Sequence, residues 1–130
     1  MTLYTGCIYH QNHSGIRISI MNRHTLADGI TLDSKITTQS YDRWEKSVAP
    51  PSQLLGDYYK RGLPWEEFER QYLLHIQKPE LAPKLAQLIE LASAQDITLL
   101  CQEETAERCH RRLLAQECKK IRPELNLVIG

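Results

Sequence analysis

Residues 97–112, ITLLCQEETAERCHRR, change character twice within a short distance. The first part is an apolar run typical of a buried strand, and polar and acidic residues follow it at positions 101–104. From Thr105 onward the apolar residues recur at helical spacing, and another apolar run follows Pro123 at residues 125–129. A strand, a helix and a strand in this order predict a right-handed βαβ unit with parallel strands. This unit restricts the chain to an α/β fold.

The first part of the chain adds two strands and three helices to this unit. Residues 3–5 form a short strand candidate, and residues 16–21 alternate apolar and polar side chains. Helical spacing is present over residues 52–59, 64–76 and 81–92. We expect a single α/β domain over residues 1–130, with a mainly parallel sheet of about four strands and helices packed on its faces. Residues 23–49 show only loop chemistry, and a long irregular segment of this kind often carries function.

Composition argues against several classes of protein. The 16 basic and 16 acidic side chains cancel, so no overall field attracts the chain to nucleic acid or to an anionic membrane. The apolar runs are much shorter than the roughly 20 residues that span a bilayer, and the amino terminus has no secretory pattern. Four cysteines without such a pattern are typical of reduced thiols, so we expect a cytoplasmic protein that makes no membrane contact.

Side chains capable of chemistry gather where the strand at residues 97–101 ends. Cys101 and Glu103 lie in the turn, and a 3.6-residue period places Cys109 and His110 on the inward face of the following helix. In open α/β sheets, ligands bind in the crevice beyond the carboxyl ends of the strands. The turn therefore predicts a polar site at this edge of the sheet.

Three chemistries fit these residues, and each has a structural alternative. Cys101 beside the imidazole of His110 has the placement of a reactive thiol, although buried cysteine commonly serves as a small apolar side chain. Glu103 is placed to act as a general base, whereas a histidine on an apolar face is more often part of a structural network. Cys7, Cys101, Cys109 and His110 could supply four zinc ligands, but their spacing matches no paired zinc motif. The adjacent residues Cys109 and His110 would also diverge by roughly 100° on a helix. We therefore assign no metal ligands, and the sequence indicates no particular cofactor.

Several runs of the sequence follow a recognisable pattern. LLCQE occupies residues 99–103, CHRRLLA occupies residues 109–115, and ISIMNR ends at Arg23. The run VAPPSQLLGDYYKRGLPWEEFERQYL lies between the early strand and the turn. Together these runs resemble the family named domain of unknown function 488, whereas residues 23–47 depart from its proline- and aromatic-rich loop. The resemblance implies a compact α/β fold and the same cluster of residues, and it implies no particular reaction.

The function that we expect is that of an enzyme or ligand-binding protein with its site at the strand ends. Arg23 and Arg111 would hold an anionic small molecule, such as a nucleotide or a nucleic-acid end, with Cys109 beside them. The candidate catalytic residues are Cys101, Glu103 and His110. The alternative is a non-catalytic adaptor or nucleic-acid-binding domain in which the cysteines and histidine are structural.

Overall fold

Five parallel strands form the sheet of the computed structural model, which describes all 130 residues. The strands are β1 (Thr2–Cys7), β2 (Ile16–Ser19), β3 (Arg43–Trp44), β4 (Ile97–Cys101) and β5 (Asn126–Val128). Their order is β3-β2-β4-β1-β5, which puts β4 in the centre. The predicted α/β fold with a parallel sheet is confirmed. The strand beyond the expected four is β3, whose two residues are too few to show a periodic pattern.

Four α-helices and two short 3₁₀ helices complete the fold. They are η1 (Lys46–Val48), α1 (Ser52–Arg61), α2 (Trp65–Ile76), η2 (Pro79–Leu81), α3 (Ala82–Ala94) and α4 (His110–Ile121). Gly62 ends α1 in the left-handed conformation with φ 73°, which favours glycine because it has no Cβ. No helix has the length and apolar character needed to cross a membrane.

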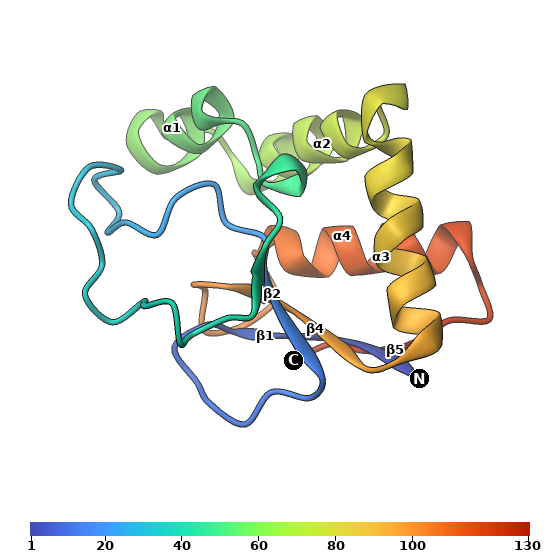
Figure 1. Cartoon of the computed structure of the whole chain (residues 1–130). Helices are drawn as coiled ribbons and strands as arrows, with labels where there is room; N and C mark the ends of the chain where they lie inside the picture. Colours follow the sequence, from blue (N-terminus) through green and yellow to red (C-terminus); the bar gives the residue numbers. More distant parts are fainter.

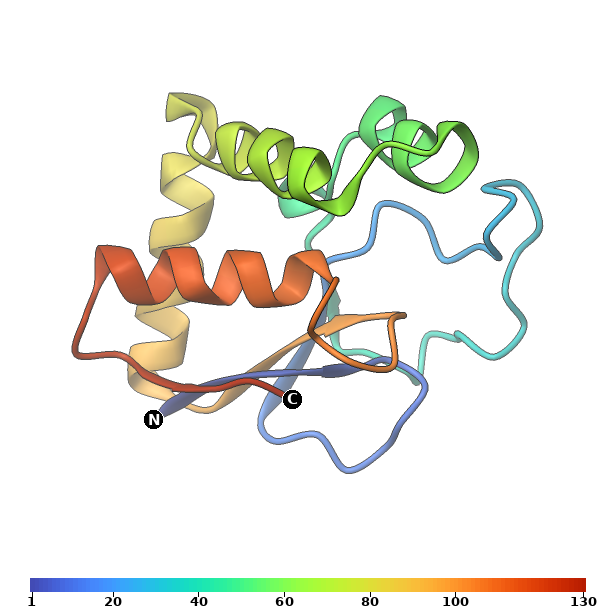
Figure 2. The ribbon, with the colours of Figure 1, turned by 180° about the vertical axis from the view of Figure 1, so that it is seen from behind.

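All four α-helices lie on one side of the sheet, as Figure 1 and the reverse view in Figure 2 show. The chain passes from β3 through α1, α2 and α3 to β4, and from β4 through α4 to β5. Both connections move across the sheet in the same direction. Because crossovers between parallel strands are right-handed, both must lie on the same face.

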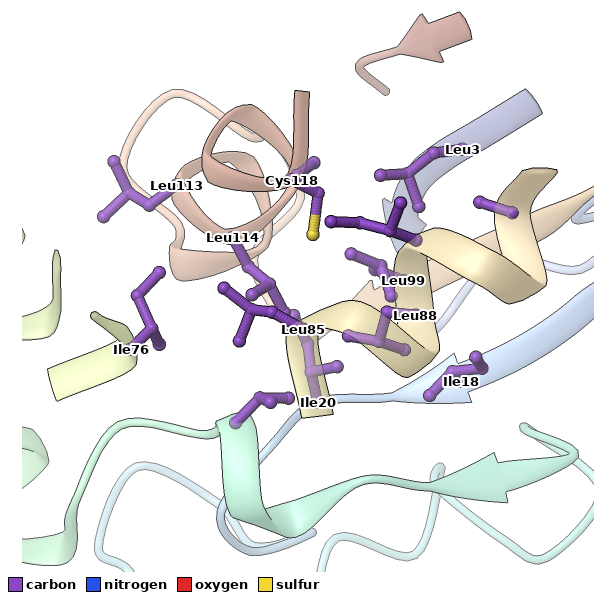
Figure 3. Packing of buried hydrophobic residues seen from close by; sticks show 14 of the residues in the cluster. Leu3, Ile18, Ile20, Ile76, Leu85, Leu88, Leu99, Leu113, Leu114 and Cys118 are labelled. Carbon is purple, nitrogen blue, oxygen red and sulfur yellow. The ribbon is translucent and has the colours of Figure 1, made fainter. Parts of the chain in front are cut away.

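The main core fills the space between these helices and the sheet. Figure 3 shows Leu3 and Leu99 of the sheet facing Leu88 of α3 and Leu114 of α4. All four side chains are at most 5% exposed. The apolar faces of α3 and α4 therefore point toward the sheet. The helix α2 packs on α4, and α1 packs on α2.

Irregular segments cover the opposite face of the sheet. The connections from β1 to β2 and from β2 to β3 run the other way across the sheet, so the same handedness rule places them on this face. Ile8, Ile36 and Leu100 pack together there. A Cβ at Gly6 would lie 2.5 Å from Cε1 of His13, so the absence of a side chain at Gly6 lets the imidazole lie against the strand.

The helix after β4 begins at His110, and not at Thr105 as the sequence pattern predicts. Residues 102–109 form an irregular loop, and Cys109 has extended backbone angles of φ −140° and ψ 139°. Arg111 donates hydrogen bonds to the main-chain oxygens of Glu103 and Glu104, at 2.6 and 3.5 Å. These bonds hold the loop in a non-helical path that the spacing of apolar residues does not reveal.

Candidate functional site

A cavity opens at the carboxyl ends of β2 and β4. The connections that leave these two neighbouring strands go to opposite faces of the sheet, which is where open α/β sheets bind ligands. Its volume is about 120 Å³, and a single water requires roughly 10–15 Å³. The walls come from the loops after β2 and β4, from α1, and from the first turns of α2 and α4. Five of the six expected site residues line it, namely Arg23, Cys101, Glu103, Cys109 and His110.

Cys101, Cys109 and His110 form a buried group in the cavity wall, which we call the Cys–His cluster. Cys101 Sγ lies 3.6 Å from His110 Nδ1. On the other side of the ring, His110 Nε2 lies 2.7 Å from the main-chain oxygen of Ile20. Because a carbonyl oxygen only accepts hydrogen bonds, Nε2 carries a proton. In the neutral imidazole this leaves the Nδ1 lone pair directed toward Cys101.

Burial controls the protonation of Cys109. Removal from water disfavours the thiolate, the neighbouring Cys101 adds to this effect, and the pKa of Cys109 is raised well above its ordinary value, although His110 acts in the opposite direction. Burial thus favours the neutral thiol at Cys109.

Glu103 is joined across the cavity to α1. The hydroxyl of Tyr59 donates a hydrogen bond of 2.6 Å to Glu103 Oε1. Burial, together with this bond to a carboxylate, raises the pKa of Tyr59 far above its ordinary value, so the hydroxyl stays protonated and continues to donate. The other carboxylate oxygen of Glu103 accepts no hydrogen bond from the protein. It is the acceptor that a ligand proton can meet.

Three cations lie around the cavity, namely Arg23, Lys60 and Arg108. The guanidinium of Arg23 donates hydrogen bonds to the main-chain oxygen of Gly29 and to Ser52 Oγ, both at 3.0 Å. These partners are neutral, so they orient the Arg23 side chain without cancelling its charge. Neither Lys60 nor Arg108 forms a salt bridge. In contrast, Arg61, which follows Lys60 at the end of α1, pairs with Asp57 at 2.7 Å.

The cavity also has an aromatic wall. Tyr58, Trp65 and Phe68 all line the cavity. The ring centroids of Trp65 and Phe68 are 5.2 Å apart with the planes inclined by 21°, and Tyr58 packs edge-on against Trp65 at 5.8 Å. The face of this wall is a suitable surface for a planar ring.

Arg111 is the expected site residue that the structure places elsewhere. Its side chain is 0% exposed and does not line the cavity. Besides its two bonds to the loop, it donates to the main-chain oxygen of Gly130 at 3.2 Å and to Cys109 Sγ at 3.5 Å. The expectation that Arg111 reaches the rim and holds an anion is corrected by this geometry. Arg111 instead positions the loop that carries Glu103.

Cys7 lies outside the Cys–His cluster, although the zinc hypothesis grouped it there. Its Sγ lies 3.7 Å from the main-chain oxygen of Gln102 and 3.8 Å from Glu104 Oε2. Glu104 also pairs with the exposed His10. Cys7, His10 and Glu104 therefore form a second group with potential metal ligands, which is distinct from the Cys–His cluster.

Several lining residues are not singled out by the sequence pattern. Trp65 and Phe68 have the spacing of ordinary core residues, and Tyr59 and Lys60 lie in the run that resembles the family, which assigns them no role. The one available signal is the run YYKR at residues 58–61, which sets aromatic and cationic side chains next to one another. Their shared role arises because α1 and α2 pack over the edge of the sheet.

Comparison with known proteins identifies the family. A family model described as the active DUF488-N3 subclade, DUF488-N3a, matches residues 3–121. No curated protein and no solved structure gives a match. The matched residues include β1 except Thr2, the strands β2 to β4, all four α-helices and the whole cavity. The chain therefore belongs to the DUF488 family, as the sequence resemblance implied.

Proposed function

We propose that the cavity is the active site of an enzyme that acts on a small anionic molecule with a planar ring, such as a nucleotide or a nucleic-acid end. The observation that supports this most directly is that unneutralised cations, an aromatic wall, a carboxylate and two thiols share one cavity. A nucleotide combines a phosphate with a planar base, so it matches both the cations and the aromatic wall.

The cations would select the anionic group. Arg23 is oriented by Gly29 and Ser52, so its guanidinium loses little freedom on binding a phosphate or carboxylate. Lys60 and Arg108 would add charge from the neighbouring walls. Since the chain as a whole has no net charge, the attraction of an anion would be local to the cavity.

Glu103 would act as the proton acceptor. Tyr59 fixes one of its carboxylate oxygens, which leaves the other available to a ligand. The Cys–His cluster would supply the reactive group beside the bound molecule. The description of the matching subclade as active supports a catalytic role over a purely structural one.

A non-catalytic adaptor is the second candidate, and it is favoured by the burial of the cluster. Cys101 and His110 are only 4% and 5% exposed, as they would be if they were internal scaffolding. In that case the cavity would bind a partner or ligand and leave it chemically unchanged.

Calorimetric titration with adenosine monophosphate, adenosine and inorganic phosphate tests the proposal. We expect the monophosphate to bind most tightly, because it alone engages the cations and the aromatic wall together. Arg23→Gln should weaken its binding by about tenfold, the usual loss for a hydrogen bond to a charged group. Arg61→Gln is the matched control, because Arg61 already pairs with Asp57, and it should leave binding unchanged.

Equal affinities for the monophosphate and adenosine, or equal losses in the two variants, would contradict the assignment of the anion site. Phosphorus and proton NMR of a nucleotide panel then separates the two candidates. Turnover that falls by about 100-fold or more in Glu103→Gln supports an enzyme with a general base. Binding without any chemical change supports the adaptor.

A further inference from the structure

The Cys–His cluster brings together donor atoms of the kind that bind zinc. Cys101 Sγ, Cys109 Sγ and a ring nitrogen of His110 all lie within 4.8 Å of one another. Zinc–sulfur and zinc–nitrogen bonds of roughly 2.3 and 2.0–2.1 Å set tetrahedral ligand atoms about 3.4–3.8 Å apart. The distance of 3.6 Å between Cys101 Sγ and His110 Nδ1 falls within this range. This pair is already spaced to share one ion.

We propose that the cluster binds Zn²⁺ through Cys101 Sγ, Cys109 Sγ and His110 Nδ1, with the fourth position directed into the cavity. Two thiolates and one imidazole with an open fourth position are a ligand set found in catalytic zinc sites. All three residues line the cavity, so an ion held by them would meet the bound molecule. The ion's part in catalysis rests on the proposed function, whereas its binding does not.

The surroundings of His110 suit a metal ligand. Metal-bound histidines usually donate their second ring N–H to a carbonyl or carboxylate, which fixes the tautomer and the ring orientation. His110 Nε2 makes such a bond to the Ile20 main-chain oxygen at 2.7 Å. The lone pair on Nδ1 is thereby directed at the two sulfur atoms.

Arg111 is placed to support a metal-bound sulfur in the cluster. Its guanidinium is fully buried, and no aspartate or glutamate side chain forms a salt bridge with it. One of its donors, Nη1, points at Cys109 Sγ from 3.5 Å. A metal-bound sulfur carries negative charge, so a guanidinium at this distance would stabilise it. Zn²⁺ neutralises the pair of thiolates, and the N–H···S contact supports the ligating sulfur from outside.

The backbone at Cys109 removes the geometric objection to this ligand pair. Adjacent residues on a helix point in different directions, so Cys109 and His110 would not share an ion if both were helical. Cys109 is extended, however, and the helix begins only at His110. The side chains of the two neighbours can therefore converge.

Binding has a defined proton balance. The two thiols each lose a proton to solvent when they ligate the ion, while the neutral imidazole loses none. About two protons should therefore be released for each ion bound. The ion supplies the positive charge that overcomes the burial of Cys109, because a coordinating thiol is deprotonated outright.

Titration of the chelator-treated protein with Co²⁺ alone, with no nucleotide present, tests the proposal. We expect one ion per chain, a near-ultraviolet thiolate-to-cobalt charge-transfer band, displacement by Zn²⁺ and the release of about two protons. Absence of stoichiometric binding by the folded wild-type chain would overturn the zinc site. Nucleotide binding is measured separately, so the two proposals can fail independently. Binding of nucleotide without metal would support the proposed function and contradict the zinc site. Binding of metal without nucleotide would support the zinc site and contradict the proposed function.

Variants locate the ion. Cys109→Ser should weaken Co²⁺ binding on the order of 100-fold, whereas Cys118→Ala removes an equally buried thiol of the same helix and should leave it unchanged. Should Cys109→Ser fail to fold, alkylation of the wild-type thiols followed by mass spectrometry gives the same information. Zn²⁺ should then protect Cys101 and Cys109 and leave Cys7 unprotected. Protection of Cys7 instead would assign the ion to the group formed with His10 and Glu104, and the proposal would be wrong.

Discussion

The two ends of α4 place the same type of side chain in very different surroundings. Cys109 caps the amino-terminal end and Cys118 lies in the second half, and they are 2% and 0% exposed. Cys109 is close to a second thiol, an imidazole and a guanidinium. Cys118 packs only in the main apolar core, beside residues such as Leu114. Figure 3 shows its sulfur among leucine side chains.

Burial therefore does not distinguish a site residue from a core residue in this protein. The difference lies in what other elements bring to each position. β4 ends at Cys101, next to the first turn of α4, and the chain after β2 brings the Ile20 carbonyl to His110. Farther along, the buried face of the helix packs against apolar side chains of the sheet and of its neighbouring helices.

The largest effect on stability should come from Arg111→Met, at the amino-terminal end. The change removes a fully buried guanidinium and leaves partly buried main-chain oxygens of the site loop without their donors. We expect a loss of about 4 kcal/mol in the free energy of unfolding. Arg108→Met is the control, because the Arg108 side chain is exposed and makes no hydrogen bond, and it should change stability by less than about 0.5 kcal/mol. Urea denaturation measures both. Similar small losses would mean that Arg111 does not hold the loop.

The next largest effect should come from Leu114→Ala in the second half of the helix. The Leu114 side chain is 0% exposed, and its truncation leaves a cavity in the main core. A loss of about 3 kcal/mol is expected from similar substitutions. Co²⁺ affinity of the folded variant should be unchanged, because the Cys–His cluster does not share this packing. A parallel loss of metal affinity would show that the two ends of α4 are coupled.

A pH dependence separates the two thiols further. Burial, with a smaller contribution from Glu117, raises the pKa of Cys118 to about 12, compared with an ordinary value of 9.0. The folded protein holds the thiol proton more tightly than the unfolded chain does. The resulting stabilisation is fully present below the pKa of the thiol in the unfolded chain, and it is lost as the pH rises through the pKa in the folded protein. Between pH 9 and pH 12 the stability of the wild type relative to Cys118→Ala should therefore fall by about 1 kcal/mol per pH unit. Denaturation of both proteins across this range measures the difference, and a constant difference would contradict the assignment.

The smallest effect on stability should come from Glu103→Gln. The amide oxygen can still accept the hydrogen bond from Tyr59, so we expect a change within about 0.5 kcal/mol. Turnover should nevertheless be lost, as the proposed role of Glu103 requires. Thermal denaturation of the variant provides the test. A loss of several kcal/mol would mark Glu103 as a structural carboxylate, and the contrast between the site and the core would then disappear.

Most of the fold follows from local patterns. The period of apolar residues predicts β2, β4 and the helical segments, and the βαβ order predicts parallel strands with right-handed connections. The start of α4 is missed because Arg111 holds residues 102–109 in a non-helical loop through contacts that a spacing pattern does not contain. The strand β3 is missed because two residues define no period.

The sequence by itself predicted that Arg23, Cys101, Glu103, Cys109 and His110 lie near one edge of the sheet, because the carboxyl ends of parallel strands share that edge. Only the tertiary structure decided that Arg111 turns inward, that Tyr59 and Lys60 of α1 close the cavity, and that Cys109 points toward the same space as His110. The shared location of these residues depends on periodicity and chain order, which can be read from short stretches of sequence. The other outcomes depend on packing between elements that are distant in the chain, and on one extended residue at a helix end, and no local pattern encodes these.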